Sequence, residues 1–139
     1  MQTQILAVTT LALSLMALPA AAGGRPIPIV DPVDAPVVWP GGTPGDVNIV
    51  KRAILAGLLI KGWTGEAVAP SVIHAVLQRP DFRAKIDISY NATSYTVKYA
   101  ASEHLDYDAD KRLIHRNYNH WIELLRRAID IEMAVLSKT

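Results

Sequence analysis

The sequence predicts a single α+β domain, a two-layer sandwich in which a four-stranded antiparallel sheet carries two helices on one face. Two neighbouring runs, 84–90 and 95–99, alternate apolar and polar residues around a short polar loop, which is typical of a β-hairpin. Apolar residues recur every three or four positions in 47–61 and again near the end of the chain, which is typical of helices that bury one face. Helices on either side of a run of strands favour a helical layer over one sheet face, in the order α-β-β-β-β-α.

The first helix is predicted over 47–61. Asp46 precedes it and is a favourable N-cap residue, and Gly62 follows it as the expected C-terminal stop. Lys51 and Arg52 are the only charged residues before its last position, and both are expected to point to solvent. Because so little of its surface is polar, we expect this helix to be largely buried.

Four strands are expected between the helices. Runs at 63–69 and 72–78 precede the hairpin. A proline-containing turn at 70–71 separates the two runs, and another at 79–81 separates the second run from the hairpin. Alternation then assigns one side of the third strand to the helices. The residues expected to face the helices are Ile86, Ile88 and Tyr90.

The second helix is predicted to begin near Ile114 and to end near Val135. Its apolar residues step by three and four positions, and Trp121 lies within this apolar stripe. Asp108 or Asp110 is expected to cap the helix and to favour the positive end of its dipole.

Residues 1–22 have the order of a secretory signal peptide. The segment has no charged side chain, and an apolar run at 5–18 is followed by Pro19 and by three alanines before Gly23. An uncleaved membrane anchor is the alternative, but polar residues dilute a run that is barely long enough to span a bilayer. We therefore expect a periplasmic or secreted protein, with no stable membrane span after cleavage.

Composition excludes several classes of function. The chain has 139 residues with 14 basic and 13 acidic side chains, so it lacks the basic excess that nucleic-acid binding requires. It has no cysteine, which excludes disulfides, thiolate nucleophiles, cysteine-ligated metal sites and a lipid anchor on cysteine.

Residues 23–45 are predicted to form an extended arm, and 46–139 the single folded domain. Six of the nine prolines lie in this arm, and each fixes its own backbone angle and removes a hydrogen-bond donor, which excludes a helix. The arm is also rich in valine and isoleucine, which is unusual for a solvated linker. It is therefore expected to lie along its own domain, the alternative being contact with a partner.

The sheet face away from the helices is expected to be polar except along one strand. If the odd-numbered residues of 72–78 point toward the helices, Val72 and Val76 lie on the outer face, and Val68 extends this strip. Exposed apolar strips usually mark contacts. The arm is the first expected cover for this strip, and a second copy of the chain, in a homodimer, is the next.

A weak family resemblance rests on several short elements. These are Gly62-Trp63, Ile73-His74-Ala75-Val76-Leu77, the paired strands 85–90 and 95–99, Ser102, and Tyr118-Asn119-His120-Trp121-Ile122. From Gly62 to Ile129 the chain resembles an uncharacterised class of small exported proteins and lipoproteins of Gram-negative bacteria. The resemblance implies location and fold, and it carries no catalytic residues to transfer.

Motifs for catalysis are missing. The sequence has no nucleophile-elbow serine and no phosphate-binding glycine loop. The acidic run 106–110 opens like a calcium loop but has Lys111 and Asn117 where an EF-hand needs glycine and glutamate. His115 and His120 lie five positions apart, so they do not share the helix face that a metalloprotease needs. We expect no cofactor and no metal.

The tyrosines form the most distinctive set of side chains. Most are expected in the core, and the alternative is a patch that binds a ligand through ring area and hydroxyl groups. The candidate ligand-binding residues are Tyr95, Tyr99, Tyr107, Tyr118 and Trp121.

The sequence favours an exported, non-catalytic binding or structural module of the periplasm or cell envelope. Its expected partner is an envelope protein, a peptide or a glycan. The alternative is a small hydrolase or metal-dependent enzyme that uses His104, His115 and nearby carboxylates.

Overall fold

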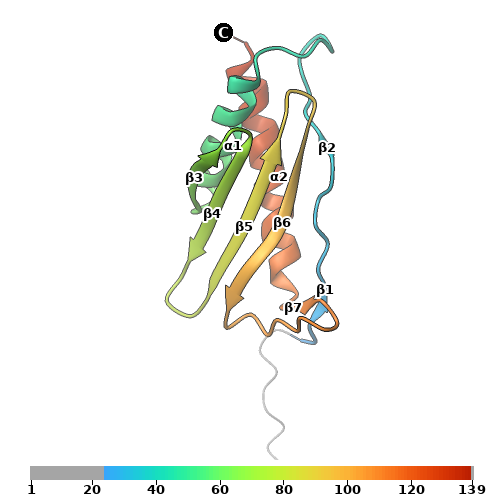
Figure 1. Cartoon of the computed structure of the whole chain (residues 1–139), viewed down its shortest axis with the longest axis vertical. Helices are drawn as coiled ribbons and strands as arrows, with labels where there is room; N and C mark the ends of the chain where they lie inside the picture. Colours follow the sequence, from blue (N-terminus) through green and yellow to red (C-terminus); the bar gives the residue numbers. More distant parts are fainter. Residues whose placement is uncertain (1–23, 139) are drawn as a thin grey trace, which may run out of the picture.

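A computed structural model of the protein describes residues 24–138, so the signal peptide predicted at 1–22 lies outside the described residues. Residues 24–138 form an α+β fold with two helices and antiparallel sheets (Figure 1). In chain order the elements are β1 (Ile27–Pro28), β2 (Ala35–Pro36), α1 (Val47–Ile60), β3 (Thr64–Ala69), β4 (Val72–Gln78), β5 (Arg83–Tyr90), β6 (Ser94–Glu103), β7 (Leu113–Ile114) and α2 (Asn117–Leu136).

The main sheet has five strands rather than the four that were predicted. Its order is β2-β6-β5-β4-β3 with every neighbouring pair antiparallel, and β1 and β7 form a separate two-stranded sheet. The four predicted strands correspond to β3 to β6. The additional strands are two residues long, and an alternating pattern cannot be recognised over two residues.

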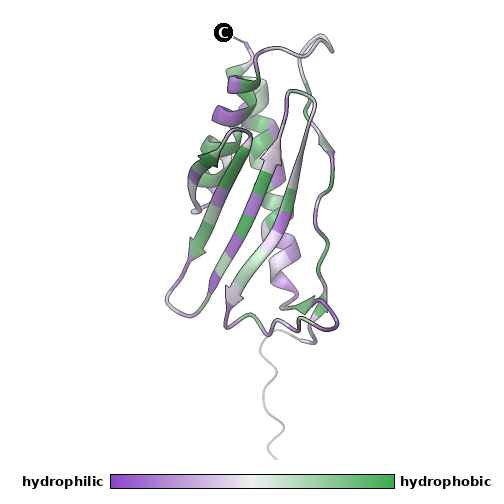
Figure 2. Ribbon diagram, in the orientation of Figure 1, coloured by the Kyte–Doolittle hydropathy of each residue, from purple (hydrophilic) through white to green (hydrophobic). Residues whose placement is uncertain are grey.

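Both helices lie on one face of this sheet and bury its inner side (Figure 1). Apolar and polar bands alternate along β5 in Figure 2, and Ile86 and Ile88 are buried as expected while Tyr90 is half-buried. The helices approach closely because Gly57 of α1 has no side chain. A Cβ atom there would lie 3.0 Å from the backbone nitrogen of Ile129 in α2.

The first helix has the ends that were expected. The Asp46 carboxylate accepts a hydrogen bond from the Asn48 backbone N–H at 2.8 Å. Gly62, with φ at +83°, supplies the left-handed residue that ends the helix. Leu59 and Ile60 nevertheless remain exposed, so α1 is less buried than its composition predicted.

The second helix begins later than predicted, and its cap is different. Ile114 belongs to β7, and the helix starts at Asn117, whose backbone N–H donates to His115 Nδ1 at 3.1 Å. Asp108 instead accepts hydrogen bonds from the backbone N–H groups of Asp110 and Lys111 within a tight turn. The acidic run therefore stabilises its own turn, which a spacing argument could not separate from a helix cap.

The arm lies along its own domain, beside the free edge of β6 (Figure 1). Val97 N–H donates to the Pro32 carbonyl at 2.9 Å, and Asp34 N–H donates to Thr96 Oγ1 at 3.0 Å. Beyond β2, Trp39 Nε1 donates to the Ala92 carbonyl at 2.6 Å. The prolines keep the arm extended, and these bonds pair polar groups of the arm with a donor and with acceptors along β6 and the loop before it.

One arm carboxylate ties three parts of the chain together. Asp31 Oδ1 accepts the Tyr99 backbone N–H of β6 at 3.0 Å, and Asp31 Oδ2 pairs with Arg112 at 3.0 Å. Nearby, the Asn119 side chain of α2 bonds the arm on both sides of Ile29. The arm is thus held by side chains as well as by backbone pairing.

The arm does not cover the outer apolar strip, contrary to the prediction. It lies at the β6 edge, and β6 and β5 separate it from β4, which carries Val72 and Val76. These two valines are half-buried and Val68 of β3 is exposed. The arm instead makes backbone hydrogen bonds with the edge strand β6. The apolar pattern did not indicate this pairing.

Candidate functional site

Three of the five predicted ligand-binding residues come together where β6, the loop after it and the start of α2 meet. The rings of Tyr99 and Tyr107 lie 4.4 Å apart, and those of Tyr99 and Tyr118 lie 5.7 Å apart in an edge-to-face arrangement. β6 provides Tyr99, the following loop provides Tyr107, and the first turn of α2 provides Tyr118. Strand alternation in β6 and the helical stripe of α2 thus place Tyr99 and Tyr118 next to each other, and the loop between them adds Tyr107.

The tyrosine cluster is filled by its own members. Tyr118 is fully buried, and the Tyr99 hydroxyl is hydrogen-bonded to Ser102 Oγ at 2.7 Å. Burial raises the pKa of both phenols, with the nearby Asp31 carboxylate adding to the rise at Tyr118. The edge of Tyr107 is the most accessible part, so the cluster serves packing more than it offers a cavity.

Tyr95 lies apart from this cluster. It is buried between β6 and α2, near Arg126 and Asp130 of the helix, and burial is the main cause of its raised pKa. Its hydroxyl makes no hydrogen bond among the described residues. Tyr95 therefore has no exposed surface for a ligand in this structure.

Trp121 lies on a different side of α2. Its ring stacks on Phe82 with centroids 4.6 Å apart and an angle of 11° between the planes. Together with Trp63 the two rings line a cavity of about 280 Å³. Lys61 and Arg79 also line this cavity. This cavity is aromatic but separate from the tyrosines, so the five residues do not form one site.

The histidines do not assemble a metal site among residues 24–138, where no three His, Asp or Glu side chains come together. His104 is exposed just after β6, and His115 accepts the first backbone N–H of α2. His74 pairs with Asp87 at 3.3 Å on the outer sheet face, where both side chains are about half exposed. The alternative enzyme thus gains no cluster around His104 and His115.

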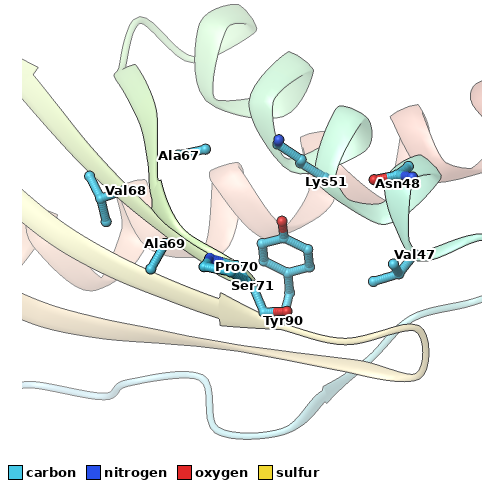
Figure 3. Close-up of a pocket in the computed structure, with 9 residues that line it drawn as sticks. All are labelled: Val47, Asn48, Lys51, Ala67, Val68, Ala69, Pro70, Ser71 and Tyr90. Atoms are coloured by element: carbon cyan, nitrogen blue, oxygen red, sulfur yellow. The ribbon is translucent and has the colours of Figure 1, made fainter.

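One cavity lies where α1 begins and where β3 turns into β4, and we call it the Tyr90 cleft. Its volume is about 460 Å³. Figure 3 shows the Tyr90 hydroxyl pointing into the space between the helix and the strand, on the side where Lys51 and Asn48 project. The cleft is lined by Val47, Asn48, Lys51, Ala67, Val68, Ala69, Pro70, Ser71 and Tyr90.

The cleft is a gap between the first turns of α1 and the end of β3. Gly65 lies against Leu55 and Leu58 of the helix, with no room for a Cβ atom. Two residues further along the strand, Ala67 is exposed although its partner Ile73 is fully buried. A gap thus remains between the layers, and Tyr90 forms part of its wall.

The polar groups of the Tyr90 cleft have no partners within residues 24–138. Neither the Tyr90 hydroxyl, the Lys51 ammonium nor the Asn48 side-chain amide makes a hydrogen bond or an ion pair there. No acidic residue is among those that line the cleft. All three groups can donate hydrogen bonds, and only the ammonium carries a charge. The cleft therefore combines apolar walls with donors suited to an anionic oxygen.

Sequence reasoning placed Tyr90 toward the helices but did not single out the cleft. Lys51 was expected on a solvated side of the first helix. The signal was the pairing of an apolar strand that ends in Ala67-Val68-Ala69-Pro70 with a lysine one turn into a helix. Only the register of β3 against β4, with a shift between Ala67 and Ala69, brings these residues together.

The comparisons identify no relative: no protein-family model, no curated protein and no solved structure matches this chain. The resemblance of 62–129 to small exported proteins therefore stays a prediction. Among the described residues, no helix has the length and apolar character needed to cross a membrane.

Proposed function

We propose that this protein is an exported, non-catalytic binding module of the periplasm or cell envelope, and that its ligand binds in the Tyr90 cleft. One observation carries the proposal. Three unpartnered donors, from Lys51, Asn48 and Tyr90, converge on a cleft with apolar walls and no acidic residue. Ligand sites characteristically combine an apolar cavity with a few polar groups that orient the ligand.

This chemistry favours a carboxylate next to small apolar side chains, such as the end of a peptide chain. A charged acceptor forms stronger hydrogen bonds with an ammonium and a hydroxyl than a neutral one does. The small side chains of Ala67 and Ala69 leave room for methyl-sized groups. A neutral glycan is less well matched, because it offers the Lys51 ammonium no charged partner.

Binding is tested with a matched pair of probes, N-acetyl-trialanine as the free acid and as the C-terminal amide. The acid should shift the NMR amide signals of Ala67, Val68, Ala69 and Ser71 at millimolar concentration, and the amide should bind much more weakly. Lys51→Gln should weaken binding of the acid by on the order of tenfold, as expected for a lost charge-assisted hydrogen bond.

A control variant and a second cleft variant make this test specific. Lys85→Gln changes a lysine on β5 that lies outside the Tyr90 cleft and should leave binding unchanged. Tyr90→Phe removes a donor but keeps the ring, so it should weaken the acid and spare the fold. Equal binding of acid and amide, or no shift at 67–71 with either probe, would exclude the carboxylate site.

Export is tested independently of the ligand. The leader predicts that the mature protein from the envelope fraction begins at Gly23 when its N-terminus is measured by mass spectrometry. Recovery of protein that still begins at Met1 would contradict cleavage, whatever the probes show.

A further inference from the structure

The outer surface of the helical layer carries large apolar side chains that no described element covers. On α1, Leu59 is 76% exposed and Ile60 is 60% exposed. On α2, Ile131 is 62% exposed and Val135 is 55% exposed. A single exposed leucine is ordinary, but four such side chains on two adjacent helices are not.

Two of these side chains share one groove, and Leu59 and Val135 are exposed on the same two helices. Ile60 and Ile131 line one groove between the helices, with a volume of about 280 Å³, and Leu124 and Ala128 form part of its wall. Lys61, Arg127 and Glu132 also line this groove. We call this surface, from Leu59 to Val135 across the groove, the helical patch.

The α1 side of the helical patch is cationic, whereas the α2 side carries both Arg127 and Glu132. On the α1 side Arg52 is exposed and Lys61 lines the groove, the segment 47–61 has no acidic residue, and neither cation forms an ion pair among the described residues. α2 carries three acidic residues against two arginines. Of these, Glu123 pairs with both arginines inside the helix, which leaves Glu132 beside the groove without an ion-pair partner in the described chain.

We propose that the helical patch binds a second copy of this chain, with α1 of each copy lying over α2 of the other. The two helices are antiparallel neighbours in the layer, so a two-fold axis along the groove exchanges them (Figure 1). This places the cationic outer side of α1, with Arg52 and Lys61, over the partner helix that carries Glu132. The same contact covers the exposed apolar residues of both copies.

The charge pattern distinguishes this occupant from an anionic lipid surface. An anionic membrane would attract the cations of α1 but would leave Glu132 facing like charge, whereas a second copy can give Glu132 a cationic partner. A second copy presents the opposite charge to each helix. The Tyr90 cleft lies on the β3 side of α1, away from the groove, so the proposed dimer leaves it open.

The test is the oligomeric state of the purified protein, measured by sedimentation equilibrium over a range of concentrations. Wild type should be a reversible dimer. Ile131→Lys should raise the dimer dissociation constant by on the order of tenfold or more, because it places a charge within the contact. Val38→Lys is the matched control, since Val38 is 66% exposed but lies on the arm. It should leave dimerisation unchanged.

A charge exchange makes the geometry of the contact testable. Arg52→Glu and Glu132→Arg should each weaken the dimer, and the double variant should regain most of the lost association because the pair is restored in reverse. Near-ultraviolet circular dichroism confirms that each variant keeps its fold. A monomer at every concentration, or a dimer that responds equally to Ile131→Lys and Val38→Lys, would overturn the proposal.

Discussion

Replacing Tyr118 with alanine should lower the free energy of unfolding by about 3–5 kcal/mol, as expected for removal of a large buried ring. Tyr118 is fully buried, at the junction of α2, β6 and the arm. Its ring supports Tyr99 edge-on at 5.7 Å, and the segment around it is held to the arm by Asn119. The cavity would lie where several elements meet, so local collapse would fill it poorly.

Removing the Tyr118 hydroxyl alone should not lower the free energy of unfolding. The oxygen is buried and makes no hydrogen bond in the described chain. Tyr118→Phe therefore removes an unsatisfied polar group and should be neutral or should stabilise the protein by up to about 1 kcal/mol. Urea unfolding of both variants measures this contrast. Tyr107→Phe, on the exposed member of the cluster, is the control and should be neutral.

Alkaline pH provides a second readout for the same ring. Burial raises the pKa of Tyr118 above the ordinary phenol value of 10.0, while the unfolded chain keeps the ordinary value. Stability from this group is complete below the ordinary value and is lost as the pH rises past it, because only the unfolded state then releases the proton. Tyr118→Phe should lose less stability above this pH than wild type does. An equal loss in both proteins would contradict a buried, neutral phenol.

The core of the fold was predictable because it depends on local periodicity. The alternation of Ile86 and Ile88 identified the inner face of β5, and Asp46 and Gly62 identified the two ends of α1. These signals act within a few residues of the chain, where side-chain direction follows directly from the backbone. The sheet between the helices was recognised for that reason.

The arm was only partly predictable because its contacts are long-range and polar. Its prolines indicated an extended backbone and its valines indicated packing, but nothing local showed where it would lie. Its place depends on Asp31, which joins Tyr99 of β6 to Arg112 of the last loop. A carboxylate that bonds partners 68 and 81 residues away leaves no periodic trace.

The candidate site was missed for a related reason. The five predicted residues were chosen because aromatic side chains gather near the hairpin, yet three of them fill their own cluster and Tyr95 is enclosed. The Tyr90 cleft instead lies in a gap between the first turns of α1 and the end of β3, which is a property of tertiary packing. Lys51 looked like a solvated charge because helical position alone does not show that a strand end lies opposite it.

Deleting 25–42 should cause self-association of a kind that wild type does not show. The deletion removes β1, β2 and the Asp31 contacts, and it leaves the backbone of β6 without its neighbour. An open strand edge is a template for pairing with other chains. The buried side chain of Ala35 is lost as well, so apolar surface beneath it becomes accessible.

This outcome is separable from the proposed dimer. In an Ile131→Lys background, where the helical patch is disabled, the truncated protein should still associate and should bind a dye that reports exposed apolar surface. Val30→Ser with Val33→Ser is the control, because both valines are exposed and the arm stays in place. That control should remain soluble and dye-negative. If the truncated protein is equally stable and equally dye-negative, the edge of β6 does not need its arm, and the 25–42 segment is a tether whose hydrogen bonds add nothing to the fold.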